Sequence, residues 1–179
     1  MEIIELLAKD WQGYLLPFRY TAYEYYDVNI ARNDSDFNVH FTKKPLDKPY
    51  EKMPNDDEKL FRPWWENVQA WGIVEDGKLL AAIETAVEEW NNRLIITELW
   101  VDDSIRRQGI AKRLMDKAMG RARAENRRAV MLETQSCNAP AIEFYLNYGF
   151  ALMGFDACAY QNNDIERKEV RMEFGILLK

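Results

Sequence analysis

Histidine and cysteine are scarce in this chain, and their scarcity excludes several classes of site. The 179 residues include one histidine and two cysteines. Cys137 and Cys158 do not have the spacing of a zinc motif, and His40 alone cannot complete a metal cluster. We therefore expect no metal site. A catalytic Cys137 would need a basic partner, and the sequence shows none, so covalent catalysis is disfavoured.

Long apolar runs and an excess of positive charge are also missing. No stretch approaches the roughly 20 consecutive apolar residues of a membrane-spanning helix. The formal net charge is −6, which argues against general nucleic-acid binding because that needs a basic face. The first residues, MEIIELLAKDW, contain no basic stretch before a long apolar run. We expect no membrane or nucleic-acid partner and a cytoplasmic protein with reduced thiols.

Hydrophobic residues make up 47% of the chain and charged residues 30%, which is typical of a soluble globular protein. This length suits one domain with a substantial core, so we expect a single domain over residues 1–179. Aromatic residues reach 13% and gather before residue 101. Aromatic faces together with carboxylates suit a cation. The candidate walls of such a pocket are Tyr23, Tyr25, Tyr26, Asp27, Trp64 and Trp65.

Hydrophobic periodicity and turn residues predict an α+β fold. Residues 12–30 are rich in tyrosine and β-formers, so part of this segment is expected to be strand. The segment 43–58 has three prolines and many charges and is interpreted as a surface loop. Residues 58–71 have helical spacing of apolar side chains, and Asp56 and Asp57 offer an acidic N-cap. We therefore expect a helix there.

The second half of the chain predicts a mixed sheet. Residues 72–101 indicate three sequential strands in an antiparallel meander, with a hairpin turn at 75–78. From Gly109 the period changes to that of an amphipathic helix of about four turns. The remaining expected elements are a strand at 129–134, a short helix at 139–148, and final strands within 150–160 and 169–177. The fold class is therefore α+β: a mixed, mostly antiparallel sheet flanked by helices, with a central β-α-β unit.

A basic, glycine-bearing turn separates the strand IITELWV from the amphipathic helix. The turn, RRQGIAKRL at 106–114, contains Arg-x-x-Gly-x-Ala. A helix N-terminus presents unpaired N–H groups and a partial positive charge, which suits a diphosphate. Gly109 lets the backbone approach such a ligand closely, and Arg106, Arg107 and Lys112 can add charge-assisted contacts. A solvated basic helix start with no ligand is the alternative.

Two motifs together identify a resemblance. The turn resembles the (Gln/Arg)-x-x-Gly-x-(Gly/Ala) signature of the GNAT superfamily of N-acetyltransferases. NAPAIEFYLNYGF, at 138–150, is similar to the family's Asn-x-x-Ala-x-x-Phe-Tyr-x-x-x-Gly-Phe. The resemblance covers roughly residues 72–155, and the segments GFALMGFDACAYQNND and EVRMEFGI resemble the streptothricin acetyltransferase branch.

This resemblance implies acetyl-CoA as co-substrate. In the family the strand before the turn diverges from the next parallel strand, and the pantetheine arm pairs with backbone groups in that opening. The cofactor-binding residues implied here are Leu99, Trp100, Val101, Arg106, Arg107, Gln108, Gly109, Ile110, Ala111, Lys112, Asn138 and Tyr145.

Two side chains are candidates for the chemistry, which the resemblance implies is direct attack of an amine on the thioester. Tyr145 would protonate or stabilise the departing thiolate; its alternative is a core tyrosine. A typical alkyl ammonium is charged at neutral pH, and a carboxylate can remove its proton directly or through a water. Glu98 is the first candidate because a carboxylate inside an apolar strand is costly to bury, and Glu84 is the second. A structural or solvent-facing glutamate is the alternative for Glu98.

The acceptor remains open at this stage between a small molecule and a peptide. Protein N-termini, polyamines and aminoglycoside- or streptothricin-like antibiotics all carry suitable amines, and the last two would imply antibiotic resistance. A homodimer is common in the family. The rival from another class is a non-catalytic acyl-CoA-binding regulatory module, because a fold does not determine a function.

Overall fold

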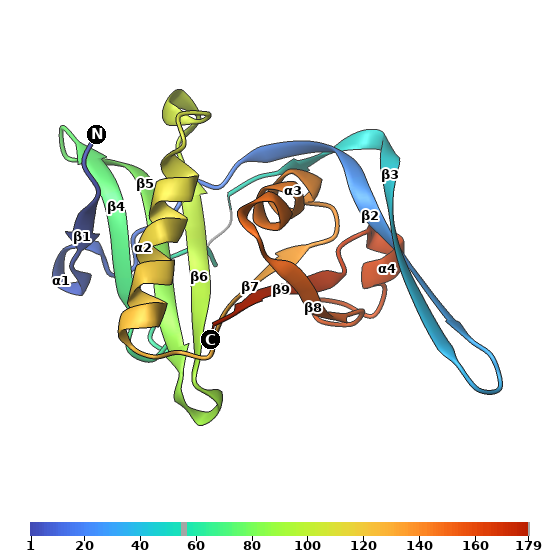
Figure 1. Ribbon diagram of the computed structural model, residues 1–179. Coiled ribbons are helices and arrows are strands. Elements are labelled where there is room, and N and C mark those ends of the chain that lie inside the picture. The colour runs from blue at the N-terminus through green and yellow to red at the C-terminus, as the bar shows by residue number, and fades with distance from the viewer. Residues whose placement is uncertain (55–56, 179) are drawn as a thin grey trace. The chain divides into compact units, whose positions relative to one another are not determined.

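The computed structural model describes residues 1–54 and 57–178, and the chain forms two compact units (Figure 1). The first unit comprises Met1–Phe18, Met53–Leu132 and Ile176–Lys179, and the second comprises Arg19–Lys52 and Glu133–Gly175. The expectation of a single domain over residues 1–179 stays a prediction.

The first unit contains the predicted meander and β-α-β unit. Its strand order is β1-β4-β5-β6-β7; neighbours from β1 to β6 are antiparallel, whereas β6 and β7 are parallel. Asp76 and Gly77 both have positive φ, as a tight hairpin turn requires. The strands are β1 (Ile4–Leu6), β4 (Gln69–Glu75), β5 (Lys78–Glu88), β6 (Arg93–Val101) and β7 (Ala129–Gln135), and β7 continues into the second unit.

Helix α2 (Ile110–Ala124) forms because its apolar residues share one face. It lies along β5 and β6 (Figure 1) and buries Leu114, Met115 and Ala118 completely. The predicted four-turn helix from Gly109 is confirmed. Shorter elements of this unit are α1 (Ala8–Trp11) and the 3₁₀ turns η1 (Glu89–Asn91) and η2 (Asp103–Ile105).

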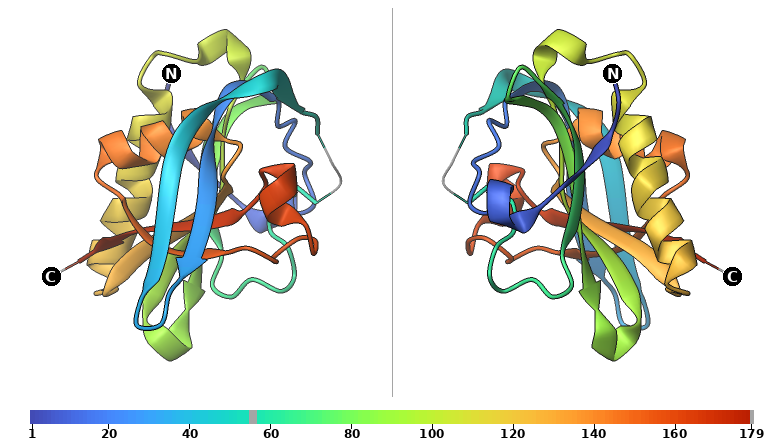
Figure 2. Two further views of the ribbon diagram at one scale, coloured as in Figure 1. Left: turned by 90° about the vertical axis from the view of Figure 1, so that its right-hand side faces the viewer. Right: turned by 90° about the vertical axis from the view of Figure 1, so that its left-hand side faces the viewer.

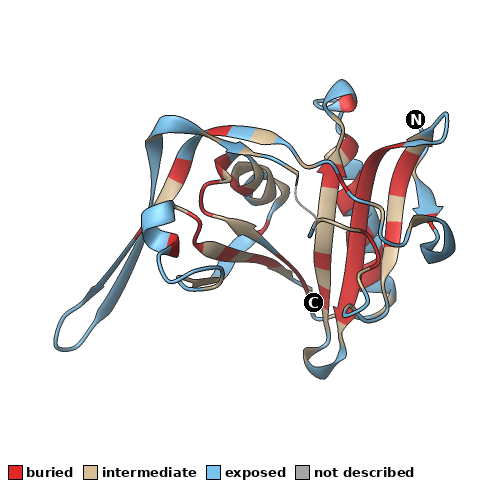
Figure 3. Ribbon diagram, turned by 180° about the vertical axis from the view of Figure 1, so that it is seen from behind, coloured by how far each residue is buried: buried red, intermediate tan, exposed pale blue. Residues whose placement is uncertain are grey.

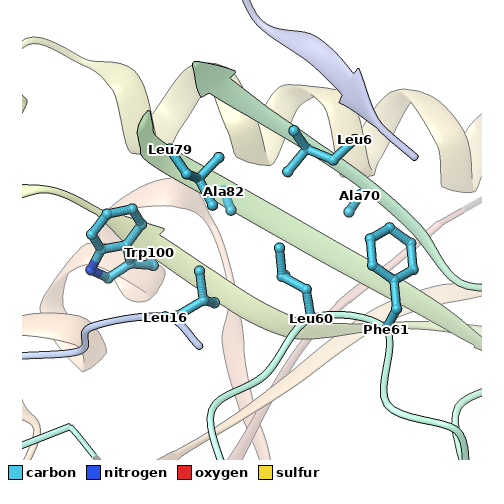
Figure 4. Packing of buried hydrophobic residues seen from close by; sticks show 8 residues of the cluster. All are labelled: Leu6, Leu16, Leu60, Phe61, Ala70, Leu79, Ala82 and Trp100. Atoms are coloured by element: carbon cyan, nitrogen blue, oxygen red, sulfur yellow. The ribbon is translucent and has the colours of Figure 1, made fainter. Parts of the chain in front are cut away.

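Burial in the first unit centres on β5, whose residues are buried along most of the strand (Figure 3). One face of the sheet is covered by chain segments that carry Leu16, Leu60 and Phe61 (Figure 4). These side chains pack with residues of the sheet, namely Leu6, Ala70, Leu79, Ala82 and Trp100. The loop that carries Leu60 and Phe61 is therefore part of the core.

The second unit combines a long two-stranded ribbon with the last two strands of the seven-stranded sheet that the described residues form. In the ribbon, β2 (Tyr20–Arg32) and β3 (Phe37–Lys52) run antiparallel beside each other (Figure 2). Helix α3 (Ala139–Tyr148) contacts β2. The strand β9 (Arg171–Leu177) lies between β7 and the antiparallel β8 (Ala151–Asp156). The predicted helix at 139–148 and both final strands are confirmed, and the loop between these strands contains the short helix α4 (Asp164–Arg167).

The predicted surface loop at 43–58 is wrong over most of its length. Residues 43–52 belong to β3, and Pro45 is paired with Glu24. Proline lacks an N–H donor, but a strand of a two-stranded ribbon has an open edge where that donor is not needed. Charge and proline content therefore marked an exposed ribbon strand.

The predicted helix at 58–71 is also wrong. Residues 57–68 form turns and bends, with a bridge between Leu15 and Lys59, and β4 begins at Gln69. Phe61 and Asn67 have positive φ, which a right-handed helix forbids. The apolar spacing reflects a loop that packs on the sheet, and the proposed cap at Asp56 lies outside the described residues.

Within residues 1–54 and 57–178, no helix has the length and apolar character needed to cross a membrane. Within the same residues, no group of three or more histidine, cysteine, aspartate or glutamate side chains is arranged to hold a metal ion.

Candidate functional site

The turn before α2 has the backbone of an anion-binding site. Gly109 is the N-cap of α2 and has φ +74°, and Arg107 has φ +61°. Left-handed residues within a turn direct successive N–H groups towards one concavity, and the first N–H groups of a helix have no partner within the helix. Gln108 is exposed, whereas Ile110 is buried and anchors the helix start. The turn therefore offers backbone donors to solvent.

Two basic side chains of this turn, Arg106 and Lys112, are paired with nearby carboxylates. Arg106 donates from Nε to the carbonyl of Val101 at 3.1 Å, and its Nη1 lies 2.7 Å from Asp103. Lys112 pairs with Asp116, one turn along α2, at 3.1 Å. These positions keep positive charge at the turn, where a diphosphate would need it.

Strand β6 pairs with its parallel neighbour for only a short distance. The register with β7 runs from Arg93↔Ala129 to Ile95↔Met131, while β6 continues to Val101. Because the pairing ends at Ile95, the backbone of Leu99 to Val101 has no β7 partner in the described residues. The Trp100 side chain is buried in the core, so only the backbone of Trp100 can meet a ligand, which is the contact that the family resemblance implies.

A bulge displaces β6 next to Glu98. Glu84 is the Cα partner of Glu98, whereas Thr85 is the partner of Ile96, so Thr97 is an extra residue in β6. A bulge redirects neighbouring side chains and is frequent beside active sites.

The carboxylate of Glu98 is almost enclosed. Its side chain is 10% exposed, and Oε1 accepts a hydrogen bond from Nη2 of Arg62 at 3.0 Å. Burial raises the pKa of this carboxyl to about 8, with the Arg62 charge opposing the rise and Glu84 adding to it. A base is most effective when its pKa lies near the working pH, so Glu98 has the properties that proton removal requires.

The second candidate base, Glu84, has different surroundings. It is fully buried, Oε2 accepts the N–H of Phe61, and Oε1 accepts the hydroxyl of Thr97 at 2.8 Å. Burial raises the pKa of this carboxyl as well. Both oxygens already accept fixed donors, so this geometry favours Glu98 over Glu84 as the base.

Asn138 and Tyr145 belong to the second unit, where α3 positions both. Asn138 is the N-cap of α3 and accepts the N–H of Ala141 through Oδ1 at 3.3 Å. The Tyr145 ring is half-buried among aromatic rings, with centroids 6.1 Å from Phe150 and 6.4 Å from Phe174. Their contacts with the co-substrate stay predictions.

The proposed acceptor walls already hold cations of the chain itself. Lys168 Nζ lies 4.6 Å from the ring centroid of Tyr25, and Lys44 pairs with Asp27. In the other unit, the Arg62 guanidinium lies 5.4 Å from the Trp64 ring centroid.

The remaining aromatic candidates and the thiol differ in their surroundings. Tyr26 donates to Glu143 at 2.8 Å, Tyr23 is exposed and Trp65 is half-buried. Cys137 is buried, and burial raises its pKa to about 11. A thiol with that pKa is rarely a thiolate at neutral pH, which agrees with the case against covalent catalysis.

Sequence reasoning missed two residues near the candidate base. Arg62 pairs with Glu98, and Thr97 donates to Glu84, the Cα partner of Glu98. Arg62 lies 36 positions from Glu98, and no local pattern connects them. The available signal was a single arginine within the apolar stretch LFRPWW.

Comparison with known proteins assigns this architecture. The model of the acetyltransferase (GNAT) family matches residues 35–150. A streptothricin acetyltransferase of Streptomyces lavendulae is 36% identical over 91 residues, 51% of this chain and 48% of that protein. A streptothricin acetyltransferase of Escherichia coli is 28% identical over 149 residues, 83% of this chain and 80% of that protein.

A solved structure has the same fold. It is a Bacillus anthracis str. Ames protein assigned as a streptothricin acetyltransferase and crystallised with acetyl coenzyme A. The TM-score is 0.74 at 24% identity, and the match covers 99% of this chain and 97% of that one. The predicted α+β fold class is confirmed.

Proposed function

Because this chain belongs to the acetyltransferase (GNAT) family, it is an acetyl-CoA-dependent N-acetyltransferase, and we propose that its acceptor is an amine of the streptothricin class. The match of the family model over residues 35–150 carries the reaction class. The acceptor class is supported by two similar proteins, from Streptomyces lavendulae and Escherichia coli, which are both streptothricin acetyltransferases. A non-catalytic acyl-CoA-binding module is not favoured.

The turn at 106–112 holds the diphosphate of acetyl-CoA in this proposal. Its support is the left-handed backbone of Arg107 and Gly109 at the start of α2. Arg106 and Lys112 lie at the same turn and would exchange their carboxylate partners for the phosphates. The pantetheine arm pairs with the backbone of residues 99–101, where pairing between β6 and β7 has ended.

Acetyl transfer then needs three proton movements. Glu98 takes a proton from the acceptor ammonium, and the neutral amine attacks the thioester carbonyl. The carbon–sulfur bond breaks as the amide bond forms, the sulfur takes the proton of the Tyr145 hydroxyl, and the remaining extra proton on the nitrogen passes to the Tyr145 phenolate, which leaves a neutral amide, a thiol and a restored hydroxyl. The enclosed carboxylate of Glu98 supports the first role, and the position of Tyr145 within the family motif supports the second. A cytoplasmic location and a homodimer stay predictions.

An acceptor panel tests this function. Purified protein is assayed with acetyl-CoA and one amine at a time: a streptothricin, an aminoglycoside, a polyamine and a peptide with an unblocked N-terminus. Thiol release gives kcat/KM for each. We expect the streptothricin to have the highest kcat/KM by at least about 100-fold, which corresponds to about 2.7 kcal/mol of transition-state discrimination. Equal values across the panel would overturn the acceptor assignment.

A further inference from the structure

The side chain of Arg62 links a core loop to the candidate base. Its Nη2 donates to Glu98 Oε1 at 3.0 Å, and its guanidinium lies over the ring of Trp64. The Arg62 and Glu98 side chains are only 20% and 10% exposed. An ion pair this enclosed is weakly screened by solvent, so the Arg62 charge acts strongly on the carboxylate.

The loop that presents Arg62 has a strained backbone. Phe61 has φ +55°, although it carries a bulky side chain. Left-handed backbone at such a residue is energetically unfavourable and persists only where its surroundings hold it. The Phe61 ring is buried in the core, and its N–H donates to Glu84.

Glu84 holds the residue before Arg62 and the residue before Glu98. One of its oxygens accepts the N–H of Phe61, and the other accepts the hydroxyl of Thr97 in the β6 bulge. A single buried carboxylate thus fixes the loop and the strand from which the ion pair is built. The strained backbone of Phe61, the enclosed ion pair and the buried carboxylate of Glu84 each cost folding free energy. All three features lie next to the candidate base.

We infer that Arg62 is a positioning residue for acetyl transfer, aimed at Glu98 by the attachment of its loop to Glu84. This inference rests on the proposed function, because it assigns Arg62 a role only if Glu98 takes the proton of the acceptor. Arg62 fixes the orientation of the carboxylate and favours its charged form. Because Arg62 lowers the pKa of Glu98, the carboxylate is ionised, and able to take a proton from the acceptor, at a lower pH than burial alone would allow.

The charges around Glu98 make opposite variants informative. Arg62 and Glu58 face it from the 57–68 loop and Glu84 from β5; Arg62 lowers its pKa, whereas Glu58 and Glu84 raise it. Removal of the Arg62 charge must therefore raise the titration midpoint of Glu98. Removal of the Glu58 charge must lower it. Glu84 is left intact in this comparison, because its carboxylate holds both Phe61 and Thr97. Damage to the fold alone would not produce two shifts of opposite sign.

The experiment compares Arg62→Gln and Glu58→Gln with the wild type. The matched control is Arg93→Gln, which removes a half-buried arginine paired with Glu88 on the same sheet. The carboxyl carbon of Glu98, assigned by its loss in Glu98→Gln, is titrated by NMR, and kcat/KM is measured against pH. We expect Arg62→Gln to raise the NMR midpoint and the acid limb of kcat/KM by about one pH unit or more.

The outcomes separate this inference from the function on which it rests. A lower midpoint in Glu58→Gln and a wild-type midpoint in Arg93→Gln complete the supporting result. Acetyl transfer by the wild type with an unshifted midpoint in Arg62→Gln overturns the inference and leaves the function standing. Absence of acetyl transfer by the wild type overturns the function, and with it the role of Arg62.

If Arg62→Gln does not fold, Arg62→Lys decides. Lysine keeps the charge but loses the planar fork of donors. We expect a midpoint close to that of the wild type together with a lower kcat, because the carboxylate is no longer held in one orientation. An unchanged kcat would overturn the positioning role.

Discussion

Glu84 and Glu98 are Cα partners across β5 and β6, yet their carboxylates have opposite surroundings. Glu84 is fully buried, and both its oxygens accept hydrogen bonds from fixed donors of the first unit. Glu98 is 10% exposed, and one of its oxygens accepts a hydrogen bond from the side chain of Arg62. The first arrangement holds structure together, whereas the second can exchange a proton.

Removal of the Glu84 carboxylate should destabilise the protein. Glu84→Ala leaves the Phe61 N–H and the Thr97 hydroxyl without their acceptor and also opens a cavity, at a cost of about 2 to 4 kcal/mol. Urea denaturation measures this loss. Glu88→Ala, on the same strand but part of a half-exposed ion pair, should cost less than about 1 kcal/mol. Equal losses in the two variants would contradict the structural role.

Ionisation of Glu98 should make stability fall as pH rises. Its folded-state pKa of about 8 lies above the unfolded value of about 4.3. Its contribution to stability is therefore complete below the unfolded pKa and is lost as pH rises through about 8. Glu98→Gln removes this dependence. Between about pH 5.5 and 8 the variant should gain up to roughly 3 kcal/mol relative to the wild type.

Urea denaturation at several pH values measures the change for Glu98. Glu88→Gln is the control, because Glu88 is a half-exposed carboxylate on the adjacent strand. If the unfolding free energies of Glu98→Gln and the wild type change in parallel with pH, Glu98 titrates as an ordinary surface carboxylate and the prediction is contradicted.

A negative side chain at Gly109 should abolish acetyl-CoA binding. Gly109→Glu places bulk and charge at the turn and forces a residue with a Cβ to adopt φ +74°. Isothermal titration calorimetry with acetyl-CoA should detect no binding. Gly120→Glu adds the same charge to the exposed face of the same helix, where a Cβ meets no atom within 4 Å. Its affinity should match that of the wild type.

Backbone strain at Gly109 is separated from charge by a second variant. Gly109→Ala introduces the strain alone, which costs of order 1 kcal/mol, and should retain measurable binding. Wild-type affinity in Gly109→Glu would remove the turn from the co-substrate site.

Loss of the Tyr145 hydroxyl should slow the reaction more than it weakens binding. A positioned acid contributes at least about 100-fold to a rate, so Tyr145→Phe should lower kcat by about that factor while acetyl-CoA affinity changes little. Tyr148→Phe removes a hydroxyl from the same helix, from a ring that also packs near Phe144 and Phe150. The control should keep wild-type kcat, and an unchanged kcat in Tyr145→Phe would end its catalytic assignment.

Local patterns in the sequence predicted the elements whose cause is local. The hairpin at Asp76 and Gly77 and the amphipathic α2 follow from turn chemistry and period. The 57–68 loop was mistaken for a helix because its apolar side chains have helical spacing. What decides its conformation is the bond from Phe61 to Glu84, 23 positions away.

In the candidate site, too, sequence predicted the local features and missed those that depend on tertiary contacts. The turn and the α3 motif could be identified because each is contiguous in sequence. The pairing of Arg62 with Glu98 and the enclosure that raises the Glu98 pKa depend on tertiary contacts. Sequence reasoning could select Glu98 as an unusual carboxylate in an apolar strand, but it could not identify the partner that controls its charge.

The mass of a streptothricin incubated with the purified chain and acetyl-CoA tests the central claim most directly. The account predicts a product one acetyl group heavier, formed together with one equivalent of coenzyme A thiol and absent when either protein or acetyl-CoA is omitted. An unmodified streptothricin, under conditions in which calorimetry shows acetyl-CoA bound to the protein, would contradict it.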